Sequence, residues 1–351
     1  MNLQWIVTKA VETGAADIFI VPGFYVSMRI GGAVTPITEK KLTPSECEAL
    51  IREIYQSDSR DMNRLLSMGD DDFSFSIQKL GRFRCNAYKQ RGSLAAVLRV
   101  VAFGLPDPQA LHIPDVVIDL YRRRRGIILV TGPAGSGKST TLACLIDKIN
   151  AERQEHVVTL EDPIEFLHQH NKSIVSQREI MQDTEGYAQA LRAALRQSPN
   201  VILVGEMRDF ETIATALTAA ETGQLILSTL HTVGAAKTID RILDVFPAGQ
   251  QQQVRIQFSL VLQAVVSQQL IPTVDGGLTP AFEVMIANNA IQNMIREGKV
   301  HQMDNVIYAG ASEGMVTMDT DILRLYQQKR ISKENALLYS TNPELMARKL
   351  G

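Results

Sequence analysis

Over the first hundred residues, apolar and polar positions alternate in short patterns that predict a small module of helices and strands. Apolar residues recur at helical spacing over residues 3–13 and stop at Gly14. Thr43 and Glu46 have the spacing of a capping box, and a further helical stretch is expected over residues 58–67. Strands are expected over residues 17–21, 25–30, 34–37, 72–78, 81–91 and 93–101. The pattern therefore predicts an α+β module whose last three strands are antiparallel.

From residue 126 the pattern changes to runs rich in Ile, Val and Leu that are separated by helical stretches. Strands are expected over residues 126–131, 156–160, 174–176, 201–204 and 225–229, with helices over 139–153, 187–196 and 211–222. Strands of this composition between helices are typical of a parallel sheet that is covered by helices on both faces. After Pro247 the pattern predicts a mainly helical course to the end of the chain.

A proline-containing stretch, AFGLPDPQALHIP, lies between the two patterns and is interpreted as a linker. We therefore expect a first domain over residues 1–101, a linker over 102–114 and a second domain over 115–351. The second domain begins with a helix over residues 115–121 that ends in four consecutive arginines. This run favours a solvated helix end beside the negative pole of the helix dipole, and contact with nucleic acid or lipid head groups is the alternative.

Composition narrows the class of protein without naming a function. A chain of 351 residues with 45% hydrophobic and 21% charged residues is long enough for two ordinary globular cores. A net charge of −2 gives no overall attraction to nucleic acid, which is not expected as a partner. Three widely separated cysteines without a C-x-x-C pair argue against a zinc site or a disulfide framework. With no leader pattern and no apolar run of membrane length, we expect a cytoplasmic protein that meets a membrane only through a partner.

A glycine-rich loop after the first buried strand carries the most specific chemistry. Gly132, Gly137, Lys138 and Ser139 have the spacing G-x-x-x-x-G-K-[ST] of a phosphate loop, between an expected strand and an expected helix. The glycines let backbone N–H groups turn onto phosphate oxygens, the lysine adds positive charge, and the serine hydroxyl can bind Mg²⁺. The residues expected to bind nucleotide are Gly132, Pro133, Gly135, Ser136, Gly137, Lys138, Ser139 and Thr140. ATP with Mg²⁺ is therefore the expected ligand.

Acidic residues and a histidine follow three further expected strands. Glu206 follows the strand VILV, so it can orient or deprotonate an attacking water or reach Mg²⁺ through a water, unless it is merely solvated. Glu161 ends another strand and can approach the same phosphate and metal. Asp162 and Glu165 are less specific, since either can cap the next turn. His231 can hydrogen-bond phosphate or be a structural residue.

These motifs together resemble those of the secretion ATPases of type IV pili and type II secretion. The matching segments are GPAGSGKST (132–140), VTLEDPIEF (158–166), VILVGEMRD (201–209), LSTLHT (227–232) and TIDRILDVFP (238–247). The family's Walker A, Asp box, Walker B and His box occur in this order. The segment AIQNMIREGK (290–299) resembles the signature of the PilT-type retraction branch, and SQQL (267–270) with an expected strand at FEVM (282–285) matches this branch as well. The resemblance covers nearly the whole chain.

The resemblance implies a RecA-like α/β ATPase domain with a parallel-rich sheet, preceded by a smaller α+β PAS-like domain. It implies that Glu161 is the Asp-box acid, Glu206 the catalytic glutamate and His231 the His-box histidine. It also implies a homohexamer in which arginines of a neighbouring subunit complete each ATP site. The matching arginines are Arg84 and Arg99, with Arg82 and Arg91 as substitutes and strand arginines facing solvent as the alternative. Expected partners are an inner-membrane pilus platform protein and an accessory retraction ATPase.

The chain departs from the family pattern at several positions. Ala134 stands where a threonine is usual, and the N-terminal segment GAADIFI lacks the polar residues that are usual at these positions. Gln197 to Asn200 replace a usual acidic stretch, which is expected to remove charge near the site. We expect neither the long additional N-terminal domain nor the tetracysteine zinc site of extension ATPases. The expected function is a hexameric Mg-ATP motor for pilus retraction, and the alternatives are a related secretion or assembly motor and an ATP-switched scaffold.

Overall fold

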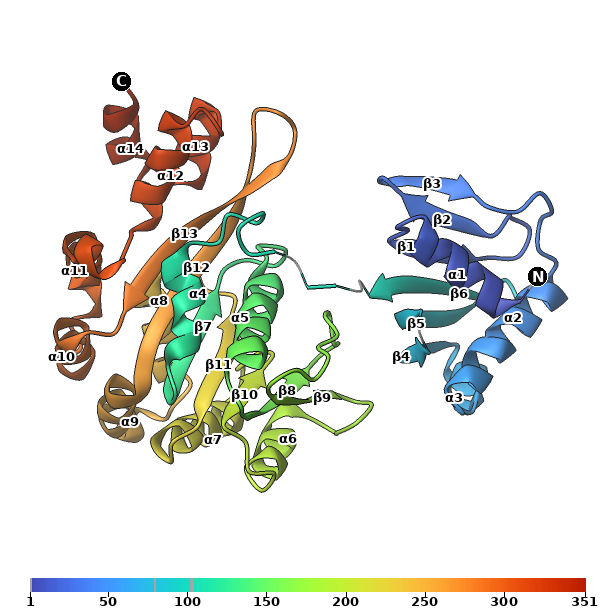
Figure 1. Cartoon of the computed structure of the whole chain (residues 1–351), viewed down its shortest axis with the longest axis horizontal. Helices are drawn as coiled ribbons and strands as arrows, with labels where there is room; N and C mark the ends of the chain where they lie inside the picture. Colours follow the sequence, from blue (N-terminus) through green and yellow to red (C-terminus); the bar gives the residue numbers. More distant parts are fainter. Residues whose placement is uncertain (1, 79, 102–103, 106) are drawn as a thin grey trace. The chain divides into compact units, whose positions relative to one another are not determined.

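The computed structural model describes residues 2–78, 80–101, 104–105 and 107–351. It divides into two compact units, which are described separately (Figure 1). The first unit comprises the chain up to Gly104 together with Glu165–Leu167, and the second comprises Leu105–Ile164 and His168–Gly351. Of the expected linker, residues 102, 103 and 106 lie outside the described residues.

The first unit is a six-stranded antiparallel sheet packed against helices, in the strand order β3-β2-β1-β6-β5-β4. The strands are β1 (Asp17–Ile20), β2 (Ser27–Ile30), β3 (Ala33–Pro36), β4 (Asp70–Ile77), β5 (Gly81–Gln90) and β6 (Ser93–Val101). The helices are α1 (Leu3–Glu12), α2 (Pro44–Ser57) and α3 (Asn63–Met68). Buried Ile6 and Ile51 from the helices join Ile18 and Phe83 from the sheet in one apolar cluster. The three expected antiparallel strands of this unit are confirmed.

Local hydrogen bonds explain where the helices of this unit begin. The expected capping box is confirmed, because the N–H of Glu46 donates to the Thr43 hydroxyl at 3.2 Å and the N–H of Thr43 donates to the Glu46 carboxylate at 2.8 Å. These bonds and nearby Lys40 lower the pKa of Glu46 to about 2. The helix expected from residue 58 is wrong in its start. Ser59 has a left-handed φ of 52°, so the chain turns before α3 begins at Asn63.

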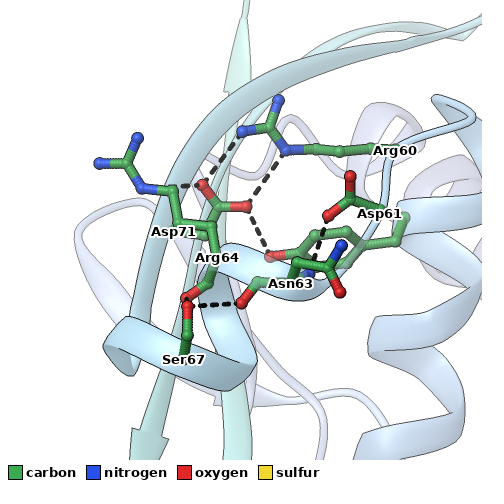
Figure 2. Close-up of polar contacts among 7 residues, drawn as sticks. Arg60, Asp61, Asn63, Arg64, Ser67 and Asp71 are labelled. Carbon is green, nitrogen blue, oxygen red and sulfur yellow. Dashed lines mark hydrogen bonds and ion pairs between the residues drawn. The ribbon is translucent and has the colours of Figure 1, made fainter.

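A buried carboxylate, Asp71, ties α2, α3 and the turn between them to β4 (Figure 2). Its Oδ2 accepts from the Tyr55 hydroxyl at 2.9 Å and from Arg60 Nε at 3.1 Å. Its Oδ1 lies 3.1 Å from Arg60 Nη2 and 3.6 Å from Arg64 Nε. The Arg60 guanidinium also lies 4.7 Å from the centre of the Phe73 ring. The carboxylate is fully buried and has lost its hydrating water, and these donors take the place of that water.

The second unit is built on a seven-stranded sheet in the order β13-β12-β7-β11-β10-β8-β9. The strands are β7 (Gly126–Thr131), β8 (His156–Glu161), β9 (Ile174–Glu179), β10 (Val201–Val204), β11 (Leu225–Leu230), β12 (Leu262–Pro272) and β13 (Leu278–Ile286). Only β13, at one edge, runs antiparallel to its neighbour among these strands of the described chain. The expected parallel strands are confirmed.

The expectation of a mainly helical course after Pro247 is wrong for residues 262–286. Helix α9 (Ala248–Val261) passes directly into β12, and β13 follows as the second strand of a hairpin. The backbone of Leu262 simply changes to an extended conformation, with ψ 130°, without a glycine or proline to mark the change. Both strands are largely buried, so their sequences lack the alternation that identifies a half-exposed strand.

Helices cover both faces of this sheet, as expected. The helical elements of the unit are α4 (Asp115–Ile118), η1 (Asp119–Arg122), α5 (Lys138–Glu152), α6 (Tyr187–Ala194), α7 (Phe210–Glu221), α8 (Ala235–Asp244), α9 (Ala248–Val261), α10 (Asn289–Glu297), η2 (Val300–Gln302), α11 (Met303–Ala309), η3 (Gly310–Glu313), α12 (Met318–Gln327), α13 (Lys333–Tyr339) and α14 (Pro343–Leu350). Ile127 and Leu129 of β7 pack with α6 to α11, whereas Ile128 and Val130 pack with α4 and α5. In the part of the chain that the structure describes, no helix combines the length and the apolar character needed to span a bilayer.

Candidate functional site

The phosphate-loop segment joins β7 to α5 and is seated on β12. Gly132 has a φ of +141°, and a Cβ there would lie 2.1 Å from the backbone oxygen of Gln268. Gly137 has a φ of +89°, and its Cβ would lie 2.7 Å from Gln268 Nε2. The same side chain accepts a hydrogen bond from the Thr141 hydroxyl at 2.7 Å, in a buried position. The two glycines are therefore required by close approach to Gln268 as well as by the backbone conformation.

The loop concentrates donors and positive charge at the start of α5. Lys138 Nζ donates to the carbonyl oxygens of Gly132 and Pro133, at 2.9 Å each. The Ser136 hydroxyl is buried and has no hydrogen-bond partner among the described residues. Ser139 is half-buried in the first helical turn. A lysine, an available buried hydroxyl and the positive end of a 15-residue helix suit a phosphate group.

The structure brings Glu161 and Glu206 to the same edge of the sheet. Glu161 is the last residue of β8, and Glu206 lies two residues beyond the end of the adjacent strand β10. Val204 is paired with Leu160, and the N–H of Gly205 donates to the Leu160 oxygen at 2.8 Å. Because β7 and these strands are parallel, their carboxyl ends and the phosphate loop share one edge. Carboxylate and hydroxyl oxygens, which include Ser139 Oγ, are ligands that suit Mg²⁺.

Glu206 is held by two cationic or potentially cationic side chains. Its Oε1 lies 2.5 Å from Arg208 Nε and 3.2 Å from His231 Nε2. His231 follows β11, the strand beside β10, which explains why the expected histidine reaches the expected glutamate. The Glu206 side chain is 17% exposed, whereas that of Arg208 is 73% exposed. The hydrogen bond from Arg208 raises the pKa of its guanidinium, and Arg208 was not predicted from the sequence.

Glu161 is oriented by two neutral donors that were not predicted from the sequence. Its Oε1 accepts from the Thr159 hydroxyl at 2.6 Å and from Gln177 Nε2 at 3.2 Å. Thr159 lies two residues earlier on the same strand face, and Gln177 is its register partner on β9. Gln177 Oε1 in turn accepts from the N–H of His168 at 2.8 Å. Burial lowers the pKa of His168 to about 4, so this histidine is neutral near pH 7.

Tyr187, the first residue of α6, is a further neighbour of the acidic edge. A Cβ on Gly205 would lie 2.8 Å from the Tyr187 hydroxyl oxygen, so this glycine leaves room for the ring. Burial, followed by the charges of Asp162, Glu206 and Glu161, raises the pKa of Tyr187. The phenol therefore stays protonated and can act as a donor near the two strand ends. No motif in the sequence indicated this residue.

The expected arginines lie in the first unit, whereas the phosphate loop lies in the second. Arg84 on β5 and Arg99 on β6 are register partners, so their side chains share one face of the sheet. Arg84 Nη2 lies 2.6 Å from Asp72 Oδ2, and Arg99 Nε lies 3.0 Å from Asp17 Oδ1. Their side chains remain 42% and 70% exposed. Of the substitutes, Arg82 lies two residues before Arg84 on β5, and Arg91 lies in the turn between β5 and β6.

The expectation that Gln197 to Asn200 remove charge near the site is wrong. These residues precede β10, so they lie at the amino edge of the sheet, and the four residues of the strand separate them from Glu206. At about 3.3 Å per strand residue this is roughly 13 Å. Asn200 has a structural role there, since its Oδ1 accepts from the N–H of His156 at 2.9 Å.

Comparisons with known proteins show similarity to one family over nearly the whole chain. The family model described as type II/IV secretion system protein matches residues 2–348. The type IV pilus retraction ATPase PilT of Pseudomonas aeruginosa is 44% identical over 345 residues, which cover 98% of this chain and 99% of that protein. A twitching motility protein of Neisseria gonorrhoeae is 43% identical over 344 residues, covering 97% and 90%. The crystal structure of the pilus retraction motor PilT with bound ADP superposes with a TM-score of 0.91 at 45% identity, covering 99% of both chains.

Proposed function

The chain belongs to the type II/IV secretion system protein family, and from this premise we propose that it is a Mg-ATP-driven motor for type IV pilus retraction. The observation that carries the proposal is the meeting of the phosphate loop, Glu161, Glu206 and His231 at one sheet edge. Near-full-length similarity to a pilus retraction ATPase and to an ADP-bound retraction motor supports this choice of ligand and output.

Each residue at the edge has a proposed role in hydrolysis. The loop amides and Lys138 bind the phosphates, and Glu206 orients and deprotonates the attacking water. His231, hydrogen-bonded to Glu206, holds that carboxylate in place and responds to loss of the terminal phosphate. Ser139, with Glu161 or Glu206 directly or through water, would hold Mg²⁺, which neutralises phosphate charge when bound.

We propose that the first unit of a neighbouring subunit completes each site within a homohexamer. Arg84 and Arg99 are exposed side by side on one sheet face, which suits a shared anionic group. A planar guanidinium neutralises charge on the transferred phosphate without a proton change. The proposed partners are a pilus platform protein at the inner membrane and an accessory retraction ATPase, with the motor on the cytoplasmic side.

Phosphate release by the purified full chain tests the ATPase directly. We expect steady ATP turnover with Mg²⁺ and a loss of at least about 100-fold when the metal is chelated, because the ion supplies several kcal/mol of charge stabilisation. Lys138→Ala is expected to abolish turnover through loss of nucleotide binding. Turnover that is equal with and without Mg²⁺, or in the Lys138→Ala variant, would refute the proposed mechanism.

Mixing inactive subunits tests whether each site is divided between neighbours. Arg99→Ala and Glu206→Gln proteins are each expected to bind ATP without turnover. Random mixing in equal amounts should restore about one quarter of wild-type activity, since one interface in four combines both intact halves. Lys138→Ala mixed with Glu206→Gln is the matched control and should restore none, because both residues lie in the same half. Equal results for the two mixtures, with subunit exchange verified by labelled chains, would contradict a divided site.

A further inference from the structure

Two consecutive residues of β12, Ser267 and Gln268, contact two different segments of the proposed ATP site. Gln268 lies against the phosphate loop and accepts from the hydroxyl of Thr141, in the first turns of α5, at 2.7 Å. Ser267, on the opposite face of the strand, accepts from the N–H of Gly234 at 2.9 Å. Gly234 lies three residues after His231, just before α8. The strand β12 therefore contacts both the phosphate loop and the segment that carries His231.

The register partner of Ser267 is a buried carboxylate, Glu283 on β13. Its Oε1 accepts from the N–H of Ala235 at 2.7 Å, and its Oε2 accepts from the N–H of Met318 at 3.4 Å. These N–H groups begin α8 and α12, so one carboxylate faces the positive ends of two 10-residue helices. Glu283 is only 6% exposed. Burial raises its pKa, and the two backbone N–H groups oppose that rise.

Helix α12 and the residue Val316 just before it contact three consecutive residues of β13. Besides the contact of Glu283, the N–H of Phe282 donates to Asp321 Oδ2 at 2.9 Å. Val284 pairs with Val316 through two backbone hydrogen bonds of 2.9 and 3.1 Å. The apolar residues of α12, α13 and α14 form one cluster with Ile271 and Ala281 of the hairpin. The three C-terminal helices, which we call the C-terminal module (residues 318–350), are therefore packed on the β12–β13 hairpin.

At its other end the same network reaches the acidic edge of the site. His231 Nε2 lies 3.2 Å from Glu206 Oε1, and the chain runs from His231 to Ala235 in four residues. The Thr232 and Thr238 hydroxyls are 2.7 Å apart, so this segment is hydrogen-bonded to the first turn of α8. A shift of His231 on loss of the terminal phosphate would therefore displace the N–H groups of Gly234 and Ala235, which donate to Ser267 and Glu283.

We propose that Glu283 is a positioning residue that couples the nucleotide at the phosphate loop to the C-terminal module, through the shared contacts of α8 and α12. The inference rests on the proposed ATPase function. It adds the route by which a movement at the ATP site reaches another part of the chain, the C-terminal module. The carboxylate offers a separate oxygen to each helix end, whereas a glutamine has one acceptor oxygen and an alanine has none. The residues between the phosphate loop and the C-terminal module are joined by direct hydrogen bonds, which is a stronger argument for coupling than their position between the two sites.

The alternative is a carboxylate that only stabilises the fold, and the two accounts differ in a measurable way. If Glu283 only stabilises the fold, nucleotide should leave the hydrogen-exchange rates of the backbone amides of residues 316–322 unchanged. The coupling account predicts that Mg²⁺ with a non-hydrolysable ATP analogue slows exchange of these amides by at least about fivefold in the wild-type protein, the lower end of usual allosteric coupling. An unchanged rate in wild-type protein that binds the analogue would overturn the inference.

Variants then locate the coupling. In Glu283→Gln the single carbonyl oxygen is expected to keep the shorter bond to Ala235 and lose the one to Met318, so the analogue still binds within about twofold while its effect on residues 316–322 disappears. Ser267→Ala is a milder second variant that releases Gly234 and should reduce the same response. Glu313→Gln, an exposed glutamate that accepts only from the Asn288 side chain in the described contacts, is the matched control and should respond as wild type.

The outcomes separate this inference from the function on which it rests. If the wild-type protein does not bind the analogue, the proposed ATPase function fails. If binding is normal but Glu283→Gln and Ser267→Ala keep the full wild-type response at residues 316–322, the ATPase function stands and the coupling role of Glu283 is refuted. Loss of the response in Glu283→Gln, with normal binding and a reduced response in Ser267→Ala, supports the coupling.

Discussion

Replacing Glu206 with glutamine is expected to lower kcat for ATP hydrolysis by about 10²–10⁴-fold, the usual contribution of a positioned general base. Glutamine keeps the shape and one acceptor oxygen, so the contacts of Glu206 with Arg208 and His231 can partly persist. It cannot take a proton from water. ATP binding should therefore stay within about threefold of wild type, because the phosphate loop is untouched.

This result is checked by phosphate release under saturating ATP, with nucleotide affinity measured separately by a fluorescent analogue. The exposed Glu185, which has no assigned role at the edge, supplies the control variant Glu185→Gln. Its kcat should match that of the wild-type protein. A Glu206→Gln protein with wild-type turnover would remove Glu206 from catalysis and leave only a structural role through its contacts with Arg208 and His231.

The second large effect is expected from Gly132→Ala, which places a methyl group 2.1 Å from the backbone oxygen of Gln268. Real Cβ atoms do not approach this closely, and neither backbone can move aside without disturbing β7 or β12. We expect a loss of at least about 3 kcal/mol in the free energy of unfolding, the upper end of overpacking costs. In a unit of this size that corresponds to a melting midpoint lower by roughly 6–12 °C.

Gly135→Ala provides the matched control within the same loop. Gly135 also has a positive φ, of +75°, but a Cβ there would meet nothing within 4 Å. Its cost should be limited to left-handed backbone strain of about 1–2 kcal/mol. Melting curves without nucleotide separate the two variants, because contact of the new methyl group with a phosphate is then absent. Equal midpoints for both would show that Gln268 does not press against the loop.

The sequence predicted those parts of the site whose chemistry is local. The phosphate loop is recognised from adjacent residues, and β7 and β10 have the expected bounds. Glu161, Glu206 and His231 follow buried strands, so parallel pairing alone places them at one edge. A resemblance to known motifs supplied Arg84 and Arg99, which composition and spacing do not single out.

The missed features depend on contacts between distant positions. Thr141 and Gln268 are 127 residues apart, and nothing near either residue shows that they meet. The hydrophobic pattern did not show the hairpin of β12 and β13, because buried strands lack alternation and because α9 runs into β12 without a turn residue. Only the resemblance pointed to a strand in this region, at FEVM (282–285). Glu283 lies in the segment FEVM (282–285) of the resemblance, but nothing in the sequence indicated its contacts with two helix ends. Such residues become visible only when the register between strands is known.

The most direct measurement of the central claim follows single fluorescent pili on living cells that carry either the wild-type gene or the Glu206→Gln allele at normal levels. The account predicts that wild-type cells extend and retract their pili, whereas cells with the variant, or with the gene deleted, bear surface pili that no longer retract. A loss of surface pili altogether in the deletion strain would contradict a retraction motor and favour a role in pilus assembly. Retraction at wild-type speed with Glu206→Gln as the sole copy would show that hydrolysis at this site does not drive the movement.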